Sequence, residues 1–371
     1  MSAGVYLHIP FCKSRCSYCD FATDVYRSGE AVERYVSALC TEVKGADGKV
    51  EADTVYFGGG TPSLLSASQV EKILEALNDR FILTSGFELT MEMNPATVTL
   101  EKLRDYRSLG VNRASFGVQT FDDTELRRLA RGHDAADARE TYRLLREAGF
   151  ENVSFDLIAG LPRQTLSDWE RNLGEAIAMQ PEHLSLYLLE IHESTPLAEQ
   201  VRSGRQPVPD EELAAEMYEM MVERLAAAGY RQYEISNFAK AGFESRHNSK
   251  YWTLDPVLGF GVSAHSFDGR DRYANERDTA RYVDLIETAG TAEVMRETIN
   301  SASEAIFLGL RLTEGIELES HQKRYGEDLR VKYAAELNDL LDAGLVRTDN
   351  ARLRLTAKGM LFSNEVFSVF V

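Results

Sequence analysis

Residues 6–21 read Tyr6-Leu7-His8-Ile9-Pro10-Phe11-Cys12-Lys13-Ser14-Arg15-Cys16-Ser17-Tyr18-Cys19-Asp20-Phe21. This segment contains three of the four cysteines, in the spacing C-x3-C-x2-C, directly after a short apolar run that is typical of a strand. Three thiolates on one loop can bind three irons of an iron–sulfur cluster, or one zinc ion with a fourth ligand from another segment. The spacing favours iron–sulfur, because a structural zinc site usually has a second cysteine or histidine pair and the sequence has none. Chance clustering of cysteines is a minor third alternative.

The bulk composition indicates a globular, cytoplasmic protein. The 371 residues include 41 Lys and Arg against 59 Asp and Glu, which gives a formal net charge of −18. This acidic balance argues against binding to nucleic acid or to an anionic membrane surface, since both require a positive field. No segment approaches the roughly 20 apolar residues that span a bilayer, so membrane insertion is not expected. In a reducing compartment the crowded cysteines favour metal, whereas Cys40, alone in a helical pattern, is predicted to be a packing thiol.

An alternation of strands and helices follows the cysteine segment and predicts an α/β fold. Each β-prone run is followed by apolar residues at helical spacing, which implies parallel strands joined by helical crossovers. From the pattern alone the sheet is either open and doubly wound or curved into a partial barrel. The six predicted strands are residues 5–9, 54–57, 87–93, 113–118, 153–158 and 183–189.

Polar or glycine-rich positions recur at the carboxyl ends of these strands, where both kinds of α/β fold build their sites. One such position is unremarkable, but one in every unit predicts a shared cavity. They are the cysteines, Gly58–Gly60, Glu92, Gln119, Asp156 and Glu190.

The last quarter of the chain has a different pattern. A single further strand is predicted within residues 230–238. Beyond about residue 279, helices are predicted at 280–289, 303–310 and 331–342, followed by a small β-wing near residues 344–356. We therefore predict two domains: residues 1–278, which carry the site, and residues 279–371, a helical domain that resembles a winged helix.

The cysteine segment, with Tyr18 before its last cysteine, resembles the cluster motif of the radical S-adenosylmethionine (SAM) superfamily. The flanking residues Tyr6 to Phe11 are similar to the group that contains oxygen-independent coproporphyrinogen III oxidases and related heme chaperones. The similarity continues through Gly58-Gly59-Gly60-Thr61-Pro62, Glu92-Met93-Asn94-Pro95, Gly117-Val118-Gln119-Thr120-Phe121, Asp156-Leu157-Ile158-x-Gly160-Leu161-Pro162 and Gly261-x-Ser263-Ala264.

This resemblance implies a partial (β/α)6 barrel with a [4Fe–4S] cluster at its carboxyl-terminal rim. Cys12, Cys16 and Cys19 would bind three irons, and SAM would chelate the fourth. The SAM site would comprise Tyr6, Tyr18, Gly59, Gly60, Thr61, Glu92, Gln119, Arg131 and Asp156. These residue types suit the ligand, because glycine lets backbone N–H groups approach closely, carboxylates accept from an ammonium or a ribose, and arginine pairs with a carboxylate. Taken alone, the glycines would more often form a turn, and Asp156 would more often cap a helix.

Two features distinguish the branches of this group. Oxidases of the group carry a fourth cysteine two residues after the last cluster ligand, where this chain has Phe21, and they carry an amino-terminal extension that is not expected here. The segment His247-Asn248-Ser249-Lys250-Tyr251-Trp252 matches the H-N-x-x-Y-W pattern of the heme chaperones. This match makes His247 a candidate heme ligand, with Tyr251 and Trp252 against the macrocycle or the barrel wall; a structural role for His247 is the alternative.

The sequence therefore predicts a heme chaperone that binds a [4Fe–4S] cluster, SAM and heme, and passes heme to an acceptor protein such as one of the respiratory chain. A coproporphyrinogen III oxidase or another radical SAM porphyrin enzyme is the alternative. A zinc-stabilised interaction protein is a third hypothesis from another class.

Overall fold

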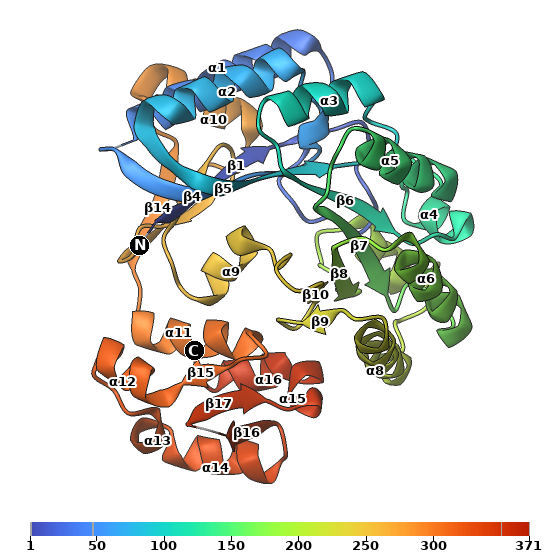
Figure 1. Ribbon diagram of the computed structural model, residues 1–371, viewed down its shortest axis with the longest axis vertical. Coiled ribbons are helices and arrows are strands. Elements are labelled where there is room, and N and C mark those ends of the chain that lie inside the picture. The colour runs from blue at the N-terminus through green and yellow to red at the C-terminus, as the bar shows by residue number, and fades with distance from the viewer. Residues whose placement is uncertain (1, 47, 350, 371) are drawn as a thin grey trace.

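The computed structural model describes residues 2–46, 48–349 and 351–370. In these ranges, six parallel strands pair side by side in the order of the sequence, which confirms the predicted α/β fold (Figure 1). Their middle residues are almost all buried, as expected for a parallel sheet that is covered on both faces. The strands are β1 (Ala3–Ile9), β4 (Val50–Gly59), β5 (Phe81–Met93), β6 (Arg113–Gln119), β7 (Val153–Ala159) and β8 (His183–Leu188).

Helices cover the outer face of this sheet, with α1, α2 and α3 over its first half and α5 and α6 over its second half (Figure 1). Side-chain caps set where they begin: Ser28 caps α1, and Ser66 forms a capping box with Gln69 at the start of α2. The bounds are α1 (Gly29–Gly45), α2 (Ala67–Arg80), α3 (Leu100–Ser108), α4 (Asp123–Arg128), α5 (Ala135–Glu147) and α6 (Leu166–Met179).

Further strands extend both edges into a 12-stranded sheet within the described part of the chain. Strand β11 (Val257–Phe260) pairs in parallel with β1, and β12 (His265–Phe267), β13 (Asp271–Asn275) and β14 (Glu293–Thr298) continue antiparallel. The opposite edge ends in β10 (Asn237–Ala239) and β9 (Arg231–Gln232). The two terminal strands of the described sheet, β14 and β9, do not pair with each other, so the barrel is partial. The single strand predicted within 230–238 is instead a hairpin, because the chain turns back where Tyr233 N–H donates to Asn237 C=O at 3.1 Å.

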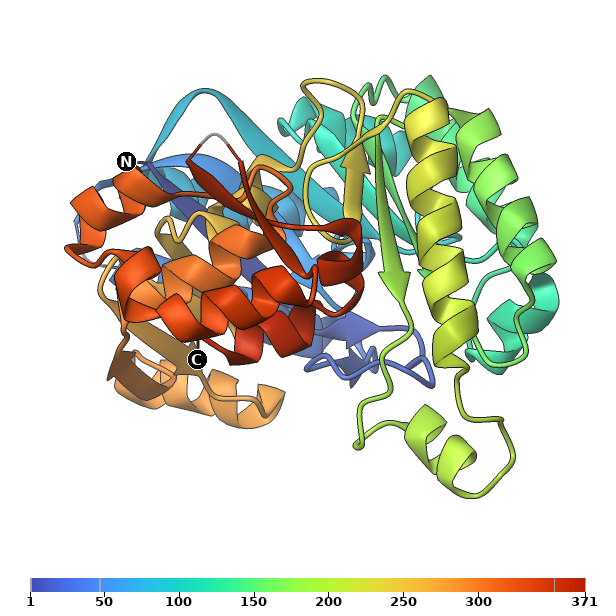
Figure 2. The same ribbon diagram turned by 90° about the horizontal axis from the view of Figure 1, so that it is seen from below.

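Three helices lie between β8 and β11. Helix α7 (Pro196–Arg202) and its loops project away from the sheet, as the yellow-green segment at the bottom of Figure 2 shows. Helix α8 (Glu211–Ala227) packs against α6. Helix α9 (Arg246–Trp252) contains the H-N-x-x-Y-W segment and lies between the sheet and the carboxyl-terminal helices (Figure 1).

The carboxyl-terminal part has a hydrophobic core of its own, which includes Ile306, Leu340 and Phe370. The helix predicted at 331–342 is divided at Tyr333, which has φ −113° and ψ 35°. The predicted wing is present as β16 and β17. The elements are β15 (Ile316–Glu317), β16 (Val346–Asp349), β17 (Arg352–Leu355), α11 (Ser301–Arg311), α12 (Leu318–Tyr325), α13 (Leu329–Lys332), α14 (Ala334–Asp342), α15 (Ala357–Leu361) and α16 (Ser363–Ser368).

The domain boundary at 278/279 remains a prediction. Helix α10 (Thr279–Ala289) packs on α1, and its Tyr282, Val283 and Ile286 share the core of the barrel. Strand β14 belongs to the large sheet. We therefore propose that the two units separate after β14, at about residue 299. Across the described ranges, no helix combines the length and the apolar character that a bilayer crossing needs.

Candidate functional site

The cysteine loop lies at the carboxyl end of β1. Two short parallel strands, β2 (Phe11–Cys12) and β3 (Asp24–Val25), close its base. Within the loop, Cys19 N–H donates to Cys16 C=O at 3.3 Å, and Ser17 N–H donates to Leu129 C=O at 2.9 Å. All three thiols are partly exposed and none is in a disulfide. In the described ranges, no three His, Cys, Asp or Glu side chains converge as a preformed site for one metal ion.

Two polar side chains contact the thiols from neighbouring loops. Thr61 Oγ1 lies 3.5 Å from Cys12 Sγ, and Arg131 Nη1 lies 3.4 Å from Cys16 Sγ. Burial raises the pKa of Cys12 to about 11, although the contact with Thr61 acts in the opposite direction. Because iron binds the thiolate, cluster insertion must displace the proton of this thiol. The loop therefore presents three accessible sulfurs with donors already placed beside two of them.

The glycine run after β4 approaches the cysteine loop very closely. A Cβ atom on Gly60 would lie 2.7 Å from the carbonyl carbon of Pro10, and one on Gly59, whose φ is +108°, would lie 2.7 Å from Cε1 of His8. Gly60 N–H donates to Ile9 C=O at 2.7 Å, and Thr61 N–H donates to Phe11 C=O at 2.8 Å. The glycines thus bring the ends of β1 and β4 together, and this arrangement places Thr61 beside a predicted ligand.

Glu92, at the end of β5, is held by two donors. Tyr56 Oη donates to Oε1 at 2.7 Å, and Gly59 N–H donates to Oε2 at 3.1 Å. Burial raises the pKa of Glu92 to about 7. The hydrogen bond from Tyr56 lowers this pKa, and the nearby Asp156 raises it further. Burial also raises the pKa of Asp156, which accepts from Ser115 Oγ at 3.4 Å. The two carboxyl groups that the sequence singles out therefore lie near each other.

Arg131 reaches the same region although it lies beyond α4. Its guanidinium contacts Tyr18 Oη at 3.4 Å, Gly117 C=O at 2.7 Å and Asn94 Oδ1, while its buried Nε has no hydrogen-bond partner among the described residues. Gln119 has a backbone φ of +67°. Its side chain lies against Gly117, because a Cβ atom on Gly117 would lie 2.4 Å from Nε2 of Gln119. The Nε–H group of the buried Arg131 has no partner in the described part of the chain, and Gly117 beside it has no side chain to block a ligand. These two features fit an anionic ligand group.

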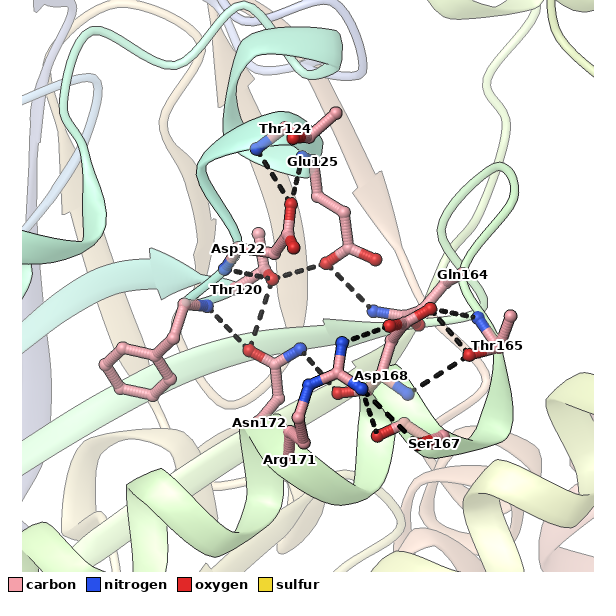
Figure 3. A network of polar contacts seen from close by, with 11 residues as sticks. Thr120, Asp122, Thr124, Glu125, Gln164, Thr165, Ser167, Asp168, Arg171 and Asn172 are labelled. Atoms are coloured by element: carbon pink, nitrogen blue, oxygen red, sulfur yellow. Dashed lines mark hydrogen bonds and ion pairs between the residues drawn. The ribbon is translucent and has the colours of Figure 1, made fainter.

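A buried polar network, shown in Figure 3, holds the rim beside Arg131 in place. The carboxylate of Glu125 accepts from Thr120 Oγ1 and, at 3.3 Å, from Gln164 Nε2. Asn172 Oδ1 accepts from Thr120 Oγ1 at 3.2 Å and from Phe121 N–H at 2.6 Å. This network joins the loop after β6 to the loop after β7. Sequence reasoning missed Glu125, because an acidic residue in the first turn of a helix usually has only an electrostatic role there.

His247 is fully enclosed. It is 1% exposed, and its ring stacks on Tyr56 at 5.0 Å and on Tyr6 at 6.4 Å between centroids. Nδ1 lies 2.9 Å from Thr54 Oγ1, and Nε2 lies 3.3 Å from Tyr251 Oη. Burial, together with the nearby Lys250 and Arg113, lowers the pKa of His247 to about 3, so this imidazole is neutral. The structure thus brings Tyr6, His247 and Tyr251 together.

Trp252 lies elsewhere. The guanidinium of Arg311, on α11, lies 4.3 Å from its ring centroid. Trp252 therefore packs toward the carboxyl-terminal helices, and its assignment as a heme contact remains a prediction.

A cavity of about 320 Å³ lies beside the cysteine loop, and Tyr251 forms part of its wall. Phe21, where the oxidases have cysteine, is 65% exposed at this cavity. The other lining residues are Tyr6, His8, Asp20, Ala22, Ser263, His265 and Arg277. The cavity wall therefore includes Asp20 and Phe21, which follow Cys19 in the cysteine loop, and Tyr251 of helix α9.

Comparison with known proteins identifies the family of this chain. Residues 6–176 match the radical SAM superfamily profile, and residues 298–362 match the HemN C-terminal domain. The heme chaperone HemW of Bacillus subtilis is 39% identical over 377 residues, which cover 99% of both chains. HemW of Lactococcus lactis is 34% identical over 99% of this chain and 97% of its own. The chain belongs to the HemW family of radical SAM proteins.

The fold agrees with a solved member of the superfamily. The structure of coproporphyrinogen III oxidase (HemN) from Escherichia coli, a radical SAM enzyme, superposes with a TM-score of 0.86 at 24% identity, over all of this chain and 90% of that one. This likeness confirms the partial radical SAM barrel with a carboxyl-terminal helical domain. Membership of the radical SAM superfamily implies a [4Fe–4S] cluster and SAM.

Proposed function

We propose that this chain is a heme chaperone that binds a [4Fe–4S] cluster, SAM and heme, and transfers heme to an acceptor protein. The observation that carries the proposal is the position of α9, whose Tyr251 lines the cavity shared with the cysteine loop. Full-length similarity to proteins named heme chaperone HemW supports it. We propose that the acceptor is a protein such as one of the respiratory chain.

The residues around the thiols fit a cluster and SAM. Cys12, Cys16 and Cys19 would hold three irons, and SAM bound to the fourth would supply either a reducible sulfonium or a structural support. Glu92 and Asp156 offer acceptors for an ammonium or for hydroxyl groups, and Arg131 offers a free N–H for a carboxylate. Tyr6, Tyr18, Gly59, Gly60, Thr61 and Gln119 would complete this SAM site, as the resemblance implies.

The first test is anaerobic reconstitution with iron and sulfide, followed by titration with hemin. We expect about four irons per chain, one bound heme, and transfer of that heme to an apo-hemoprotein. Cys16→Ser should lose most of the iron, whereas Cys40→Ser, a matched change at a thiol outside the loop, should keep it. Tight zinc binding without iron uptake would overturn the proposal.

The oxidase alternative is tested separately. Reduced, reconstituted protein is incubated with SAM and coproporphyrinogen III, and the porphyrin products are separated by chromatography. We expect no decarboxylated product. Robust turnover would replace the chaperone with an enzyme.

A further inference from the structure

Of the pair formed by His247 and Tyr251, the tyrosine lines the cavity. His247 is 1% exposed, and both of its ring nitrogens are engaged, one with Thr54 and the other with Tyr251. Tyr251 instead lines the cavity, together with Phe21 and His265. A ligand in this cavity therefore meets the tyrosine, and the histidine lies behind it.

Heme iron accepts tyrosine as an axial ligand as well as histidine, and a ferric iron suits an anionic oxygen. We propose that Tyr251 supplies the oxygen that binds the iron of ferric heme, and that His247 is a positioning residue that donates a hydrogen bond to this oxygen. The inference rests on the proposed function, since it names how that cargo is held. In this arrangement His247 acts on the heme iron through Tyr251 and does not contact the heme itself.

The hydrogen bonds around His247 are consistent with this assignment. If the Thr54 hydroxyl donates to Nδ1, the neutral ring carries its proton on Nε2, which lies 3.3 Å from Tyr251 Oη. This Nε2–H then stabilises a phenolate on Tyr251. The protein therefore fixes the tautomer through a residue of β4, far in sequence from α9.

The ligand exchange balances without an oxidant or reductant. Ferric heme in neutral water carries an axial hydroxide. The Fe–OH bond breaks, the Tyr251 O–H proton leaves with that hydroxide as water, and an Fe–O bond to Tyr251 forms. Iron stays ferric throughout, and His247 stays neutral.

The rest of the cavity wall suits the other parts of heme. Phe21 offers an exposed aromatic ring to the macrocycle. Arg277, whose Nη2 donates to Asp20 C=O at 2.8 Å, lies at the same wall and can pair with a propionate. His265 is a competing ligand in the same cavity, so the test includes it.

The experiment uses the full chain, reconstituted with its cluster, with SAM added, and titrated with hemin. Resonance Raman and electron paramagnetic resonance spectra report the iron ligand. The wild type should show an iron–phenolate stretch and high-spin ferric heme. Tyr251→Phe should lose the stretch and bind hemin at least about tenfold more weakly, whereas Tyr273→Phe, at a tyrosine that does not line the cavity, should match the wild type.

His247→Ala and Thr54→Val should keep the iron–phenolate stretch but shift it, because the hydrogen bond to the phenolate weakens. If Tyr251→Phe leaves the spectrum unchanged and His247→Ala or His265→Ala removes the ligand, the assignment is overturned while heme binding stands. If the wild type binds no hemin, the proposed function fails and this inference fails with it. Thermal melts of each variant distinguish loss of ligand from loss of fold.

Discussion

The side chain of Glu88, on β5, accepts hydrogen bonds from the backbone N–H groups of Arg246 and His247, each at 3.1 Å. These N–H groups begin helix α9, so a carboxylate from the barrel caps the helix that carries Tyr251. Glu88 and His247 are both buried, whereas Arg246 is exposed. The position of α9 therefore depends on a residue far away in the sequence.

Glu88→Ala should lower the free energy of unfolding by about 2 kcal/mol, because it leaves the N–H group of the buried His247 unpaired. Chemical denaturation monitored by circular dichroism measures this. Glu51→Ala, an exposed change on the neighbouring strand β4, is the control and should have an effect within about 0.5 kcal/mol. Equal stability of the two variants would refute the capping role.

Gly60→Ala should destabilise the cysteine loop, because its Cβ would lie 2.7 Å from backbone atoms of Pro10. We expect a loss of at least about 2 kcal/mol in unfolding free energy and a reduced iron content after reconstitution. Gly174→Ala, in the middle of α6 with open space around the new methyl group, should instead stabilise by up to about 1 kcal/mol. The pair of variants checks the sign as well as the size of the effect.

Arg311 joins the carboxyl-terminal helices to the barrel. Its Nη2 lies 3.9 Å from Oε2 of Glu234, which is 0% exposed, and its guanidinium lies over Trp252. Arg311→Gln should cost about 2 kcal/mol, because it leaves a buried carboxylate without its cation, and it should speed limited proteolysis between the two units.

Adding Glu234→Gln to Arg311→Gln should recover part of the lost unfolding free energy, since it removes the buried carboxylate that Arg311→Gln leaves without a cation. Arg330→Gln, whose partner Asp328 is on the surface, should change stability little. A double variant that is less stable than Arg311→Gln would contradict the pairing.

Glu92 should give the SAM-free protein an unusual pH dependence. Its pKa of about 7 lies above that of an unfolded glutamate, because burial disfavours the charge. Its stabilising contribution is therefore complete below the unfolded pKa of about 4.3 and is lost as the pH rises toward 7. Glu92→Gln should flatten this fall in unfolding free energy between about pH 5 and 7. Glu51→Gln should follow the wild type, and identical slopes for all three proteins would count against the assignment.

The strands and their polar ends were predictable from the sequence, because parallel strands read as apolar runs with a polar residue where each ends. Residues 113–118 and 153–158 illustrate this, as does Glu92 at the end of β5. The hairpin at β9 and β10 was not predictable, since Tyr230–Phe238 has no glycine or proline to mark a turn.

The hydrogen-bond partners of polar residues inside strands were also not predictable from the sequence. Thr54 and Tyr56 read as ordinary members of an apolar β-run, yet they hold His247 and Glu92. The first contact joins residues 193 apart in the sequence and the second joins residues 36 apart, and no local periodicity indicates either. The enclosure of His247 follows from these contacts, so a motif alone did not show which of its residues meets the cavity.

The pairing of β1 with β11 has a consequence for synthesis. The strand that leads into the cysteine loop lies between β4 and β11, and Gly4 is in register with Val257. On a growing chain, β1 therefore has one unpaired edge until about 260 residues have left the ribosome. Exposed strand edges promote aggregation, and long-range parallel pairing is slow. The nascent barrel is thus open beside its future cluster loop until β11 has been synthesised.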